Sequence, residues 1–340
     1  MPEQTNIPAN LRNLDQHEFG ALTEPHRREL RAHCYRMLGC VQDAEDMVQE
    51  TFLRAWNRRE TYEARSTLRA WLYKIATNQC LDALKKKPWR GLPISREDAS
   101  TLEQPIPASV TEPIWLEPYP DDFPASAEFS TESNYLARED IRLAFVTSLH
   151  LLPPRQRAVL ILRDVLDWQA DEVADVLEQT VPSVKSALHR ARTTLAKHRQ
   201  TLHLDEINPH LADEDLRSKL ELFVHAWQTA DVDGLLSLLM DDATFSMPPI
   251  PSWYRGRENI GGLVRKTIFG GQANGRWRLL PTRANSQPGF GLYKLNEGIK
   301  NYDGYGIQVL TFDGEQIVDI TTFRNPALMG VFQLPSTLPA

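Results

Sequence analysis

The chain has 340 residues, of which 41% are hydrophobic and 24% charged, and its formal net charge is −7. This length and composition fit two or three ordinary globular domains. Cys34, Cys40 and Cys80 form no CxxC pair and leave an odd count, which argues against a disulfide framework. The sequence has no apolar run that could span a bilayer and no secretory pattern at its start, so it predicts a cytoplasmic protein without a membrane partner.

Positive and negative charge are segregated along the chain. Between Arg54 and Arg90, ten Lys and Arg stand against three acids, whereas between Glu97 and Asp140 eleven acids stand against one Arg. Basic segments separated by an acidic one favour binding of a polyanion by the basic segments. We expect five parts: a tail (1–22), a helical domain (23–90), an acidic Pro-rich linker (91–135), a second helical domain (136–203) and a mixed domain (213–335).

The first helical domain is predicted to contain three helices: "HRRELRAHCYRMLG", "VQDAEDMVQETFLRAWNRRE" and "STLRAWLYKIATNQCLDALKKK". The first stops at Gly39, a usual residue at the end of a helix, and Ser66 or Thr67 can cap the third. The second has an apolar stripe at intervals of four residues: Ala44, Val48, Phe52 and Trp56. The linker that follows has six prolines between Pro105 and Pro124 and no apolar period, so we expect it to have no core of its own.

A helix-turn-helix is predicted in "WQADEVADVLEQTVPSVKSALHRAR". A helix at about residues 170–177 is followed by the polar break "EQT" and by a second helix with Pro182 in its first turn. The run from Ser183 to Gln200 has five Lys or Arg and no acid. Such a face favours DNA because each phosphate contact releases counterions, and its hydroxyls can reach base edges. The alternative is an ordinary solvated basic face.

The last domain changes character from helices to strands. Two helices, "DLRSKLELFVHAWQTA" and "DVDGLLSLLMDD", precede a third near residues 258–269. Strand-like runs follow: "RWRLLPTRAN", "GFGLYKL", "YGIQVLTFDG" and "QIVDITTFRN". Their alternation and their glycine turns indicate an antiparallel sheet, and "TFDGEQIVDI" is typical of a tight hairpin. We therefore expect an α+β domain.

These motifs together resemble a known family. "DAEDMVQETFLRAW", "STLRAWLYKIATNQCLDALKKK" and "LPPRQRAVLILRDVLDWQADEVADVLEQTVPSVKSALHRAR" resemble regions 2 and 4 of an extracytoplasmic-function sigma factor. "AWQTADVDGLLSLLMDDATFSMPP", "WYRGRE" and "RANSQPGFGLYK" resemble a SnoaL-like domain. The resemblance implies a multidomain fold: a region 2 helical bundle, a region 4 helix-turn-helix, and a cone-shaped α+β domain with a pocket. It also implies an alternative sigma factor that directs RNA polymerase core to specific promoters.

The resemblance implies RNA polymerase core as a partner, through its clamp region and flap, and assigns the "DAEDMVQETF" helix to the clamp. The residues implied are Asp43, Glu45, Asp46, Gln49, Glu50 and Phe52. Carboxylates and an amide suit a basic partner, and the Phe side chain adds an apolar anchor. The acids at residues 43–46 have an alternative explanation, because a helix N-terminus favours negative charge in any protein.

The resemblance also implies two contacts with promoter DNA. Cations, aromatics and an amide around the region 2 loop would hold the −10 element as single-stranded DNA: Arg58, Arg59, Tyr62, Arg65, Trp71, Lys74 and Asn78. Trp71 also lies on an apolar stripe and could equally belong to the core. The region 4 recognition helix would read the −35 element as duplex with Ser183, Lys185, Ser186, His189, Arg190 and Arg192. The acidic linker is either an RNA mimic threaded through the polymerase's RNA path or a solvated tether.

SnoaL-like domains include polyketide cyclases, so an enzyme has to be weighed against a regulatory domain. Candidate pocket residues are Trp227, Met247, Trp253, Tyr254, Arg283, Asn285 and Tyr293, although about half suit a core equally well. Asp241, Asp242 and His225 complete no acid–base pair, so we expect no enzyme, metal or cofactor. The predicted domain regulates in cis, with a small-molecule ligand or an intramolecular partner. The alternatives are a stand-alone ligand-responsive helix-turn-helix regulator and a SnoaL-type enzyme fused to DNA-binding domains.

Overall fold

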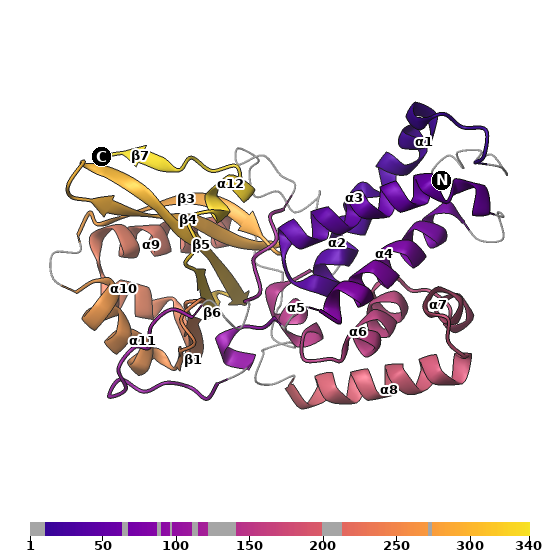
Figure 1. The fold of residues 1–340 in the computed structure, drawn as a ribbon. Helices are drawn as coiled ribbons and strands as arrows, with labels where there is room; N and C mark the ends of the chain where they lie inside the picture. The colour runs from indigo at the N-terminus through magenta and orange to yellow at the C-terminus, as the bar shows by residue number, and fades with distance from the viewer. Residues whose placement is uncertain are drawn as a thin grey trace. The chain divides into compact units, whose positions relative to one another are not determined.

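The computed structural model describes residues 11–62, 67–86, 90–95, 97–110, 115–121, 141–198, 213–270 and 274–340. The chain divides into two compact units, shown with their helices and strands in Figure 1. The helical unit comprises residues 1–90 and 148–198, and the C-terminal unit comprises residues 91–147 and 199–340. In the part of the chain that the structure describes, we find no helix both long and apolar enough to cross a membrane.

The helical unit is built from the elements predicted for regions 2 and 4. Its helices are α1 (Gln16–Thr23), α2 (Arg27–Leu38), α3 (Val41–Asn57), α4 (Leu68–Leu84), α6 (Pro154–Leu160), α7 (Ala170–Leu177) and α8 (Val181–His198), and α5 (Leu143–Leu149) ends in it. Gly39 ends α2 with a φ of 71°, and Thr67 caps α4 by accepting a hydrogen bond from the Ala70 N–H at 3.1 Å. Both predicted helix ends are confirmed.

The helix-turn-helix forms without the glycine that such turns usually contain. Glu178 ends α7 in the left-handed conformation with a φ of 53°, and its N–H bonds the Ala174 carbonyl oxygen. Glu172 accepts a hydrogen bond from the Gln169 N–H at 2.6 Å and so closes the other end of α7. The turn is therefore fixed by hydrogen bonds at both ends of α7, and Pro182 falls in the first turn of α8 as predicted.

A buried arginine joins the two parts of the helical unit. Arg157 in α6 is 1% exposed. Its guanidinium donates to the carbonyl oxygens of Leu149 at 3.0 Å, Leu152 at 3.3 Å and His150 at 3.4 Å, and to that of Met37 at the end of α2. Burial lowers the pKa of Arg157 to about 9. One cation thus satisfies carbonyl groups at the end of α2 and in the turn before α6.

A buried histidine lies between α2 and α4. His33 is fully buried, its Nε2 is 2.9 Å from Thr77 Oγ1, and its ring packs edge-on against Tyr73. Burial lowers the pKa of His33 to about 3. The imidazole is therefore neutral in the folded protein throughout the physiological pH range.

This histidine predicts a loss of stability in mild acid. Between pH 6.5 and pH 3 the unfolded chain binds a proton at His33 and the folded chain does not, so the free energy of unfolding falls as the pH falls. From pH 7 to pH 5 the His33 contribution is about 2 kcal/mol. Urea unfolding at both pH values, compared with His33→Gln, measures it. An equal pH dependence in the variant would contradict the assignment.

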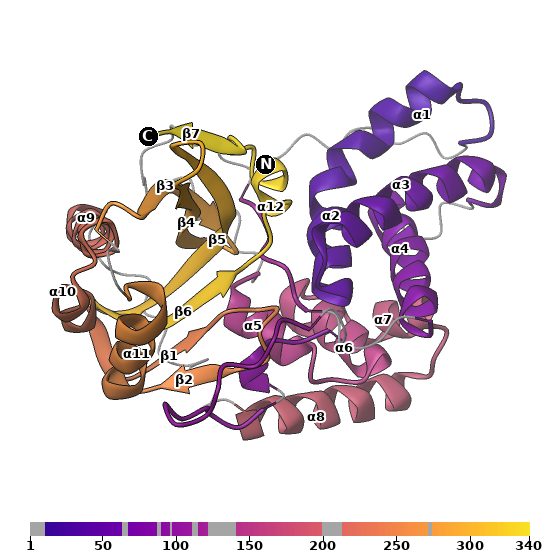
Figure 2. The same ribbon diagram turned by 60° about the vertical axis from the view of Figure 1, so that its left-hand side comes forward.

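The C-terminal unit contains a seven-stranded sheet covered on one face by helices (Figure 2). The strands are β1 (Leu239–Ser246), β2 (Trp253–Arg255), β3 (Trp277–Ala284), β4 (Gln287–Asn296), β5 (Asn301–Asp313), β6 (Gln316–Phe323) and β7 (Thr337–Pro339). Their order is β2-β1-β6-β5-β4-β3, with β7 on β5, and only β1 and β6 pair in parallel. The α+β fold is confirmed, and Gly314 with a φ of 53° forms the predicted β5–β6 hairpin.

One predicted helix is partly a strand. The run "DVDGLLSLLMDD" forms α10 only over Val232–Ser237, and β1 begins at Leu239, which pairs with Ile317 of β6. A leucine-rich run is buried in either conformation, so its apolar spacing does not distinguish a helix from a strand. Pairing with β6, which lies about eighty residues further along the chain, stabilises the strand conformation of this run.

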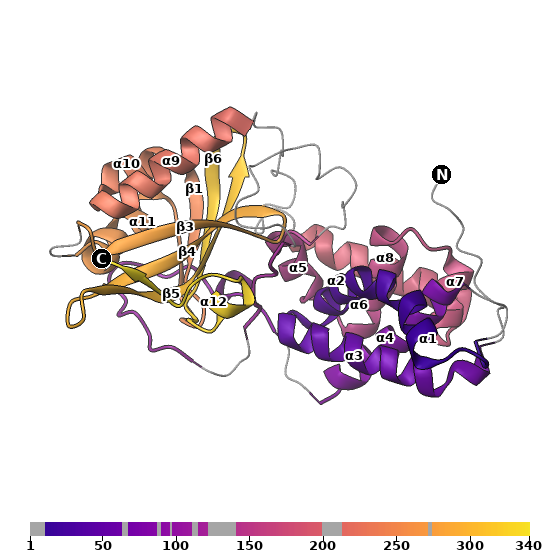
Figure 3. The same ribbon diagram turned by 90° about the horizontal axis from the view of Figure 1, so that it is seen from above.

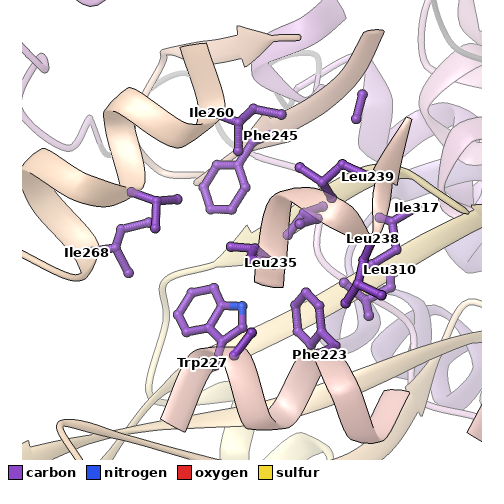
Figure 4. Close-up of a cluster of buried hydrophobic side chains, with 14 of the residues drawn as sticks. Phe223, Trp227, Leu235, Leu238, Leu239, Phe245, Ile260, Ile268, Leu310 and Ile317 are labelled. Atoms are coloured by element: carbon purple, nitrogen blue, oxygen red, sulfur yellow. The ribbon is translucent and has the colours of Figure 1, made fainter. Parts of the chain in front are cut away.

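The core of the C-terminal unit lies between the sheet and helices α9 (Asp213–Thr229), α10 and α11 (Arg257–Leu263), which cover the same face (Figure 3). The short helix α12 (Leu328–Val331) contacts β5. Phe223 and Trp227 project from α9 into the buried cluster (Figure 4). Leu292 and Phe290 face this cluster from β4, so by alternation Tyr293 lies on the opposite face of the sheet.

Candidate promoter and polymerase interfaces

The six residues predicted to contact the −35 element are all exposed on α8. Val184, Leu188 and Ala191 are buried on the other side of the same helix. Arg192 is bound by both oxygens of Asp164, at 2.9 and 2.7 Å, and Arg190 donates to Ser186 Oγ at 2.7 Å. Lys185 and His189 complete this exposed face, which carries cations and hydroxyls. The helix α8 itself contains no Asp or Glu. Such a face can position phosphates and reach base edges.

The aromatic residues of the predicted −10 site form two small contacts. Tyr62 and Trp71 pack with their ring centroids 5.3 Å apart, and Trp71 is half-buried. The Arg59 guanidinium lies over the Trp56 ring at 3.9 Å and donates to the Trp56 carbonyl oxygen at 3.0 Å. Trp71 therefore has one part in the core and one part accessible, which is compatible with both of its predicted roles.

The polar residues of the predicted −10 site are more dispersed. Arg58 is exposed at the end of α3, and Asn78 is half-buried in α4. Lys74 lies 3.4 Å from a carboxylate oxygen of Glu178, the residue that ends α7. Arg65 lies outside the described residues. In this structure the Lys74 ammonium thus faces the helix-turn-helix, so binding of DNA by Lys74 would replace the Glu178 carboxylate with phosphate.

Three of the six residues predicted to bind polymerase, Asp43, Glu45 and Phe52, contact other helices or segments of their own chain. Asp43 pairs with Arg90 at 2.8 Å, and both side chains are largely buried. The Arg27 guanidinium binds Glu45 at 2.9 Å and also lies over the Phe52 ring at 5.0 Å. Asp43 in particular stabilises the fold, because a buried ion pair that loses one partner leaves an uncompensated charge.

The outward face of α3 is formed by the other three residues and by a leucine that the sequence analysis missed. Asp46 and Gln49 are exposed, and Glu50 points to the same side and binds Arg54 at 2.6 Å. Leu53 is 54% exposed in the next turn. The spacing 46, 49, 50 and 53 puts these side chains on one face of a helix, which is the signal that identifies Leu53.

Part of the acidic linker packs on the C-terminal unit. Trp253 Nε1 donates to the Glu97 carbonyl oxygen at 2.7 Å, and the Ser100 N–H donates to the Trp253 carbonyl oxygen at 2.8 Å. Leu102 lies on α11, where a Cβ at Gly262 would come within 2.3 Å of its Cδ1. The glycine therefore allows the linker to lie directly on the helix. The described residues 97–110 thus pack on the C-terminal domain.

A second attachment is formed by the turn between β3 and β4, which we call the linker clamp (residues 283–287). Asn285 is fully buried with a φ of 57°. Its Oδ1 accepts from the Tyr119 N–H at 2.8 Å, its Nδ2 donates to the Ile141 carbonyl oxygen at 2.6 Å, and its own N–H donates to the Tyr119 carbonyl oxygen at 2.8 Å. This residue therefore binds the chain on both sides of residues 122–140.

The neighbours of Asn285 in the linker clamp add further contacts. Arg283 pairs with the buried carboxylate of Asp121 at 3.4 Å, and the Ser286 N–H donates to the same carboxylate at 2.9 Å. Gln287 accepts from the Leu143 N–H at 2.9 Å. Arg283 and Asn285, predicted as pocket residues, are not among the residues that line the cavity, and their side chains hold the linker.

The C-terminal unit contains a partly open cavity of about 200 Å³ against the helix-covered face of the sheet. Of the seven predicted pocket residues, Trp227 and Met247 line it, together with Phe245, Trp277, Tyr305 and Arg324. Tyr254 is buried in the core elsewhere, and Trp253 holds the linker. Tyr293 lies on the opposite face, where its hydroxyl donates to the Pro335 carbonyl oxygen at 2.9 Å. Strand alternation explains this, because Leu292 and Lys294 face the cavity.

Comparisons with known proteins agree with this arrangement. Residues 22–90 match the family description "Sigma-70 region 2", and residues 142–195 match "Sigma-70, region 4". The chain is 38% identical over 338 residues to the ECF RNA polymerase sigma factor SigG of Mycobacterium tuberculosis (strain CDC 1551 / Oshkosh), covering 97% of this chain and 87% of the relative. It is 29% identical over 191 residues to the ECF RNA polymerase sigma factor SigW of Bacillus subtilis (strain 168), covering 55% of this chain and 92% of SigW.

A solved structure shares the fold over nearly the whole length. The crystal structure of the Mycobacterium tuberculosis extracytoplasmic function sigma factor SigJ superposes with a TM-score of 0.56 at 23% identity, covering 93% of this chain and 99% of that one. The predicted family resemblance is therefore confirmed. The protein belongs to the extracytoplasmic-function (ECF) family of RNA polymerase sigma factors.

Proposed function

We propose that the protein is an alternative sigma factor that directs RNA polymerase core to specific promoters in the cytoplasm, and that its C-terminal domain regulates this activity in cis. The observation that carries the regulatory part is the linker clamp, in which the fully buried Asn285 binds main-chain groups of Tyr119, within the acidic segment, and of Ile141, just after it. The regulation acts through the linker between the two DNA-binding regions.

The promoter contacts follow the charges of the helical unit. Arg190 and Lys185 on α8 bind the −35 duplex, and the Arg192 side chain, which is 60% exposed, exchanges Asp164 for a phosphate. The cations and aromatics around Arg59 and Trp71 take up the −10 element as a single strand, because unstacked bases need aromatic surfaces and their backbone needs cations. Docking on polymerase core uses the outward face of α3.

Leu53 provides a test of the polymerase interface. Leu53→Asp is expected to weaken binding to RNA polymerase core about 30-fold, because an apolar anchor inside a protein interface contributes about 2 kcal/mol. Leu222→Asp is the matched control, since Leu222 lies in α9 of the C-terminal unit and is also 54% exposed. Binding is measured by titrating fluorescently labelled protein with core polymerase. Equal affinities of the two variants would place the interface elsewhere.

The acidic linker has two binding places that exclude each other, the polymerase's RNA path and the surface of the C-terminal domain. The resemblance to the family implies that the linker passes through the polymerase's RNA path, which an acidic chain suits. Residues 97–110 and 119–121 are here bound by the C-terminal domain through Trp253 and the linker clamp. One segment cannot occupy both places, so binding of the linker by the C-terminal domain competes with initiation. We infer that release of the linker raises promoter activity.

The cavity of the C-terminal domain supports binding of a ligand better than catalysis. The described residues that line it include no Asp, Glu or His, and its titratable side chains are Lys294, Tyr305 and Arg324. Asp241 and Asp242 pair with Arg257 and Arg255 on the surface, and His225 lies on the exposed side of α9. We therefore propose that the domain is regulatory and is not an enzyme.

In vitro transcription tests the proposed function. The full-length protein is added to RNA polymerase core with a library of genomic promoters, and transcript starts are mapped. Initiation at a defined promoter set is expected only when the protein is present. A mobility shift of the same DNA without polymerase separates the alternatives. Tight duplex binding without polymerase, with no promoter-specific initiation, would indicate a stand-alone regulator and overturn the proposal.

A further inference from the structure

The cavity of the C-terminal unit has an aromatic wall and a cationic rim. Trp227 and Trp277 contact each other edge to face with centroids 5.7 Å apart, and Tyr305 packs edge-on against Trp277 at 5.1 Å. Met247 lines the apolar side, while Arg324 and the exposed Lys294 supply positive charge. The cavity is therefore amphipathic, with flat apolar surfaces and cations but no carboxylate among its described lining residues.

Two donors at this cavity are buried without a hydrogen-bond acceptor. They are Nε1 of Trp227, a residue only 1% exposed, and Nε of Arg324. The Arg324 guanidinium lies 5.2 Å from the centroid of the Tyr305 ring. Throughout the described part of the chain no carboxylate lies within ion-pair distance of Arg324. Among the described residues its side chain hydrogen-bonds Tyr305, a neutral partner that leaves the guanidinium without a counter-charge beside the cavity.

Unpaired buried donors are uncommon because each costs about 1–3 kcal/mol of lost hydration, and more when the group is charged. The same domain satisfies its other buried tryptophan N–H groups: Trp253 Nε1 has the Glu97 carbonyl oxygen, and Trp277 Nε1 has the Ile268 carbonyl oxygen at 3.3 Å. Trp227 and Arg324 are exceptions that border the cavity, whereas Ser252 Oγ and Gln308 Oε1, which also have no partner among the described residues of this unit, do not line it. A bound acceptor explains both exceptions.

The size of the cavity limits the ligand. A cavity of about 150 Å³ holds one benzene ring, so about 200 Å³ holds one ring with a short polar arm. We propose that the cavity binds a small aromatic carboxylate, with its ring against Trp227 and Trp277 and its carboxylate accepting from Arg324. A small aromatic carboxylate would then be the class of signal to which the regulatory domain responds. The binding of this ligand is independent of the proposed function, and only its effect on transcription rests on that function.

The linker contributes one residue to the cavity, which connects the ligand to the proposed regulation. Ile106 lines the cavity from the linker, between the contacts made by Leu102 and by the Val110 N–H with the Pro249 carbonyl oxygen at 3.0 Å. A ligand that touches Ile106 is bound better when the linker is in place. By thermodynamic linkage the same ligand then stabilises the bound linker.

Phenylacetate is a suitable probe, and phenylacetamide is its neutral counterpart of the same shape. Binding to the full-length protein is measured by isothermal titration calorimetry and by tryptophan fluorescence. Phenylacetate is expected to bind at least about tenfold more tightly than phenylacetamide, because only the anion neutralises the guanidinium. Arg324→Gln is expected to abolish this difference. Arg278→Gln, at an exposed position of β3 that alternates with Trp277, is expected to preserve it.

Equal affinity for the acid and the amide in the unaltered protein, or no saturable binding of either, would overturn the ligand class. This comparison needs no variant, so a folding defect in Arg324→Gln cannot obscure it. The binding measurement contains no polymerase. Failure of promoter-specific transcription with normal phenylacetate binding would therefore contradict the proposed function alone, and the reverse result would contradict the ligand alone.

Discussion

Replacing Asn285 with Gly is expected to release the linker from the C-terminal domain and to raise promoter-specific transcription several-fold. The Asn285 side chain accepts from the Tyr119 N–H and donates to the Ile141 carbonyl oxygen, in a fully buried position. Without the side chain both main-chain groups lose their partners, which costs about 1–3 kcal/mol each. Gly keeps the positive φ of 57° at no steric cost, so the variant removes the side chain and its hydrogen bonds while the turn keeps its backbone conformation.

Hydrogen exchange and transcription together test this variant. The Tyr119 amide is expected to exchange faster in Asn285→Gly, and the same preparation is expected to give more run-off transcript with core polymerase. Ser286→Gly is the control, because Ser286 also has a positive φ, of 59°, and is exposed. Faster exchange at Tyr119 with unchanged or lower transcription would show that the linker is not inhibitory when bound to the C-terminal domain.

Replacing Arg157 with Met is expected to lower the free energy of unfolding of the helical unit by about 3 kcal/mol. The guanidinium binds the carbonyl oxygens of Leu149, His150 and Leu152 and that of Met37 in α2. Breaking a buried network in this way costs about 3–5 kcal/mol, and removal of a desolvated charge offsets part of that cost. Met fills much of the same volume, so the change reports mainly the lost hydrogen bonds.

Arg155 offers a matched comparison for Arg157. It lies in the same helix two residues earlier and is exposed, so Arg155→Met is expected to change stability by less than about 0.5 kcal/mol. Urea unfolding followed by far-ultraviolet circular dichroism measures both variants. A loss below about 1 kcal/mol in Arg157→Met would mean that the four carbonyl groups find other partners.

The sequence predicts the helices of regions 2 and 4 well because their signals are local. α7 runs from Ala170 to Leu177 as expected, since its apolar spacing and its capping residues lie within ten positions. The strand β1 was missed because its conformation depends on the distant β6. The inward position of Asp43 was also beyond a local pattern, because Arg90 lies 47 residues away.

The linker clamp shows a different limit of sequence interpretation. In the run "RANSQPG" the sequence predicts Arg283 and Asn285 as pocket residues. Polar residues in a turn suit a pocket and a clamp equally well, and only the contacts with Tyr119, Asp121 and Ile141 separate the two. The exposed Leu53, in contrast, has a local signal in its spacing from Asp46 and Gln49.

The linker clamp also sets how freely the intervening chain can vary. Asn285 binds Tyr119 on one side and Ile141 on the other, so the described residues that flank residues 122–140 are held at the same turn. For a loop with fixed ends that lie close together, doubling the length costs only about 0.6 kcal/mol. Homologous chains can therefore differ widely in length here, and a peptide tag or a small reporter domain can be inserted near its middle while both anchor points stay in place.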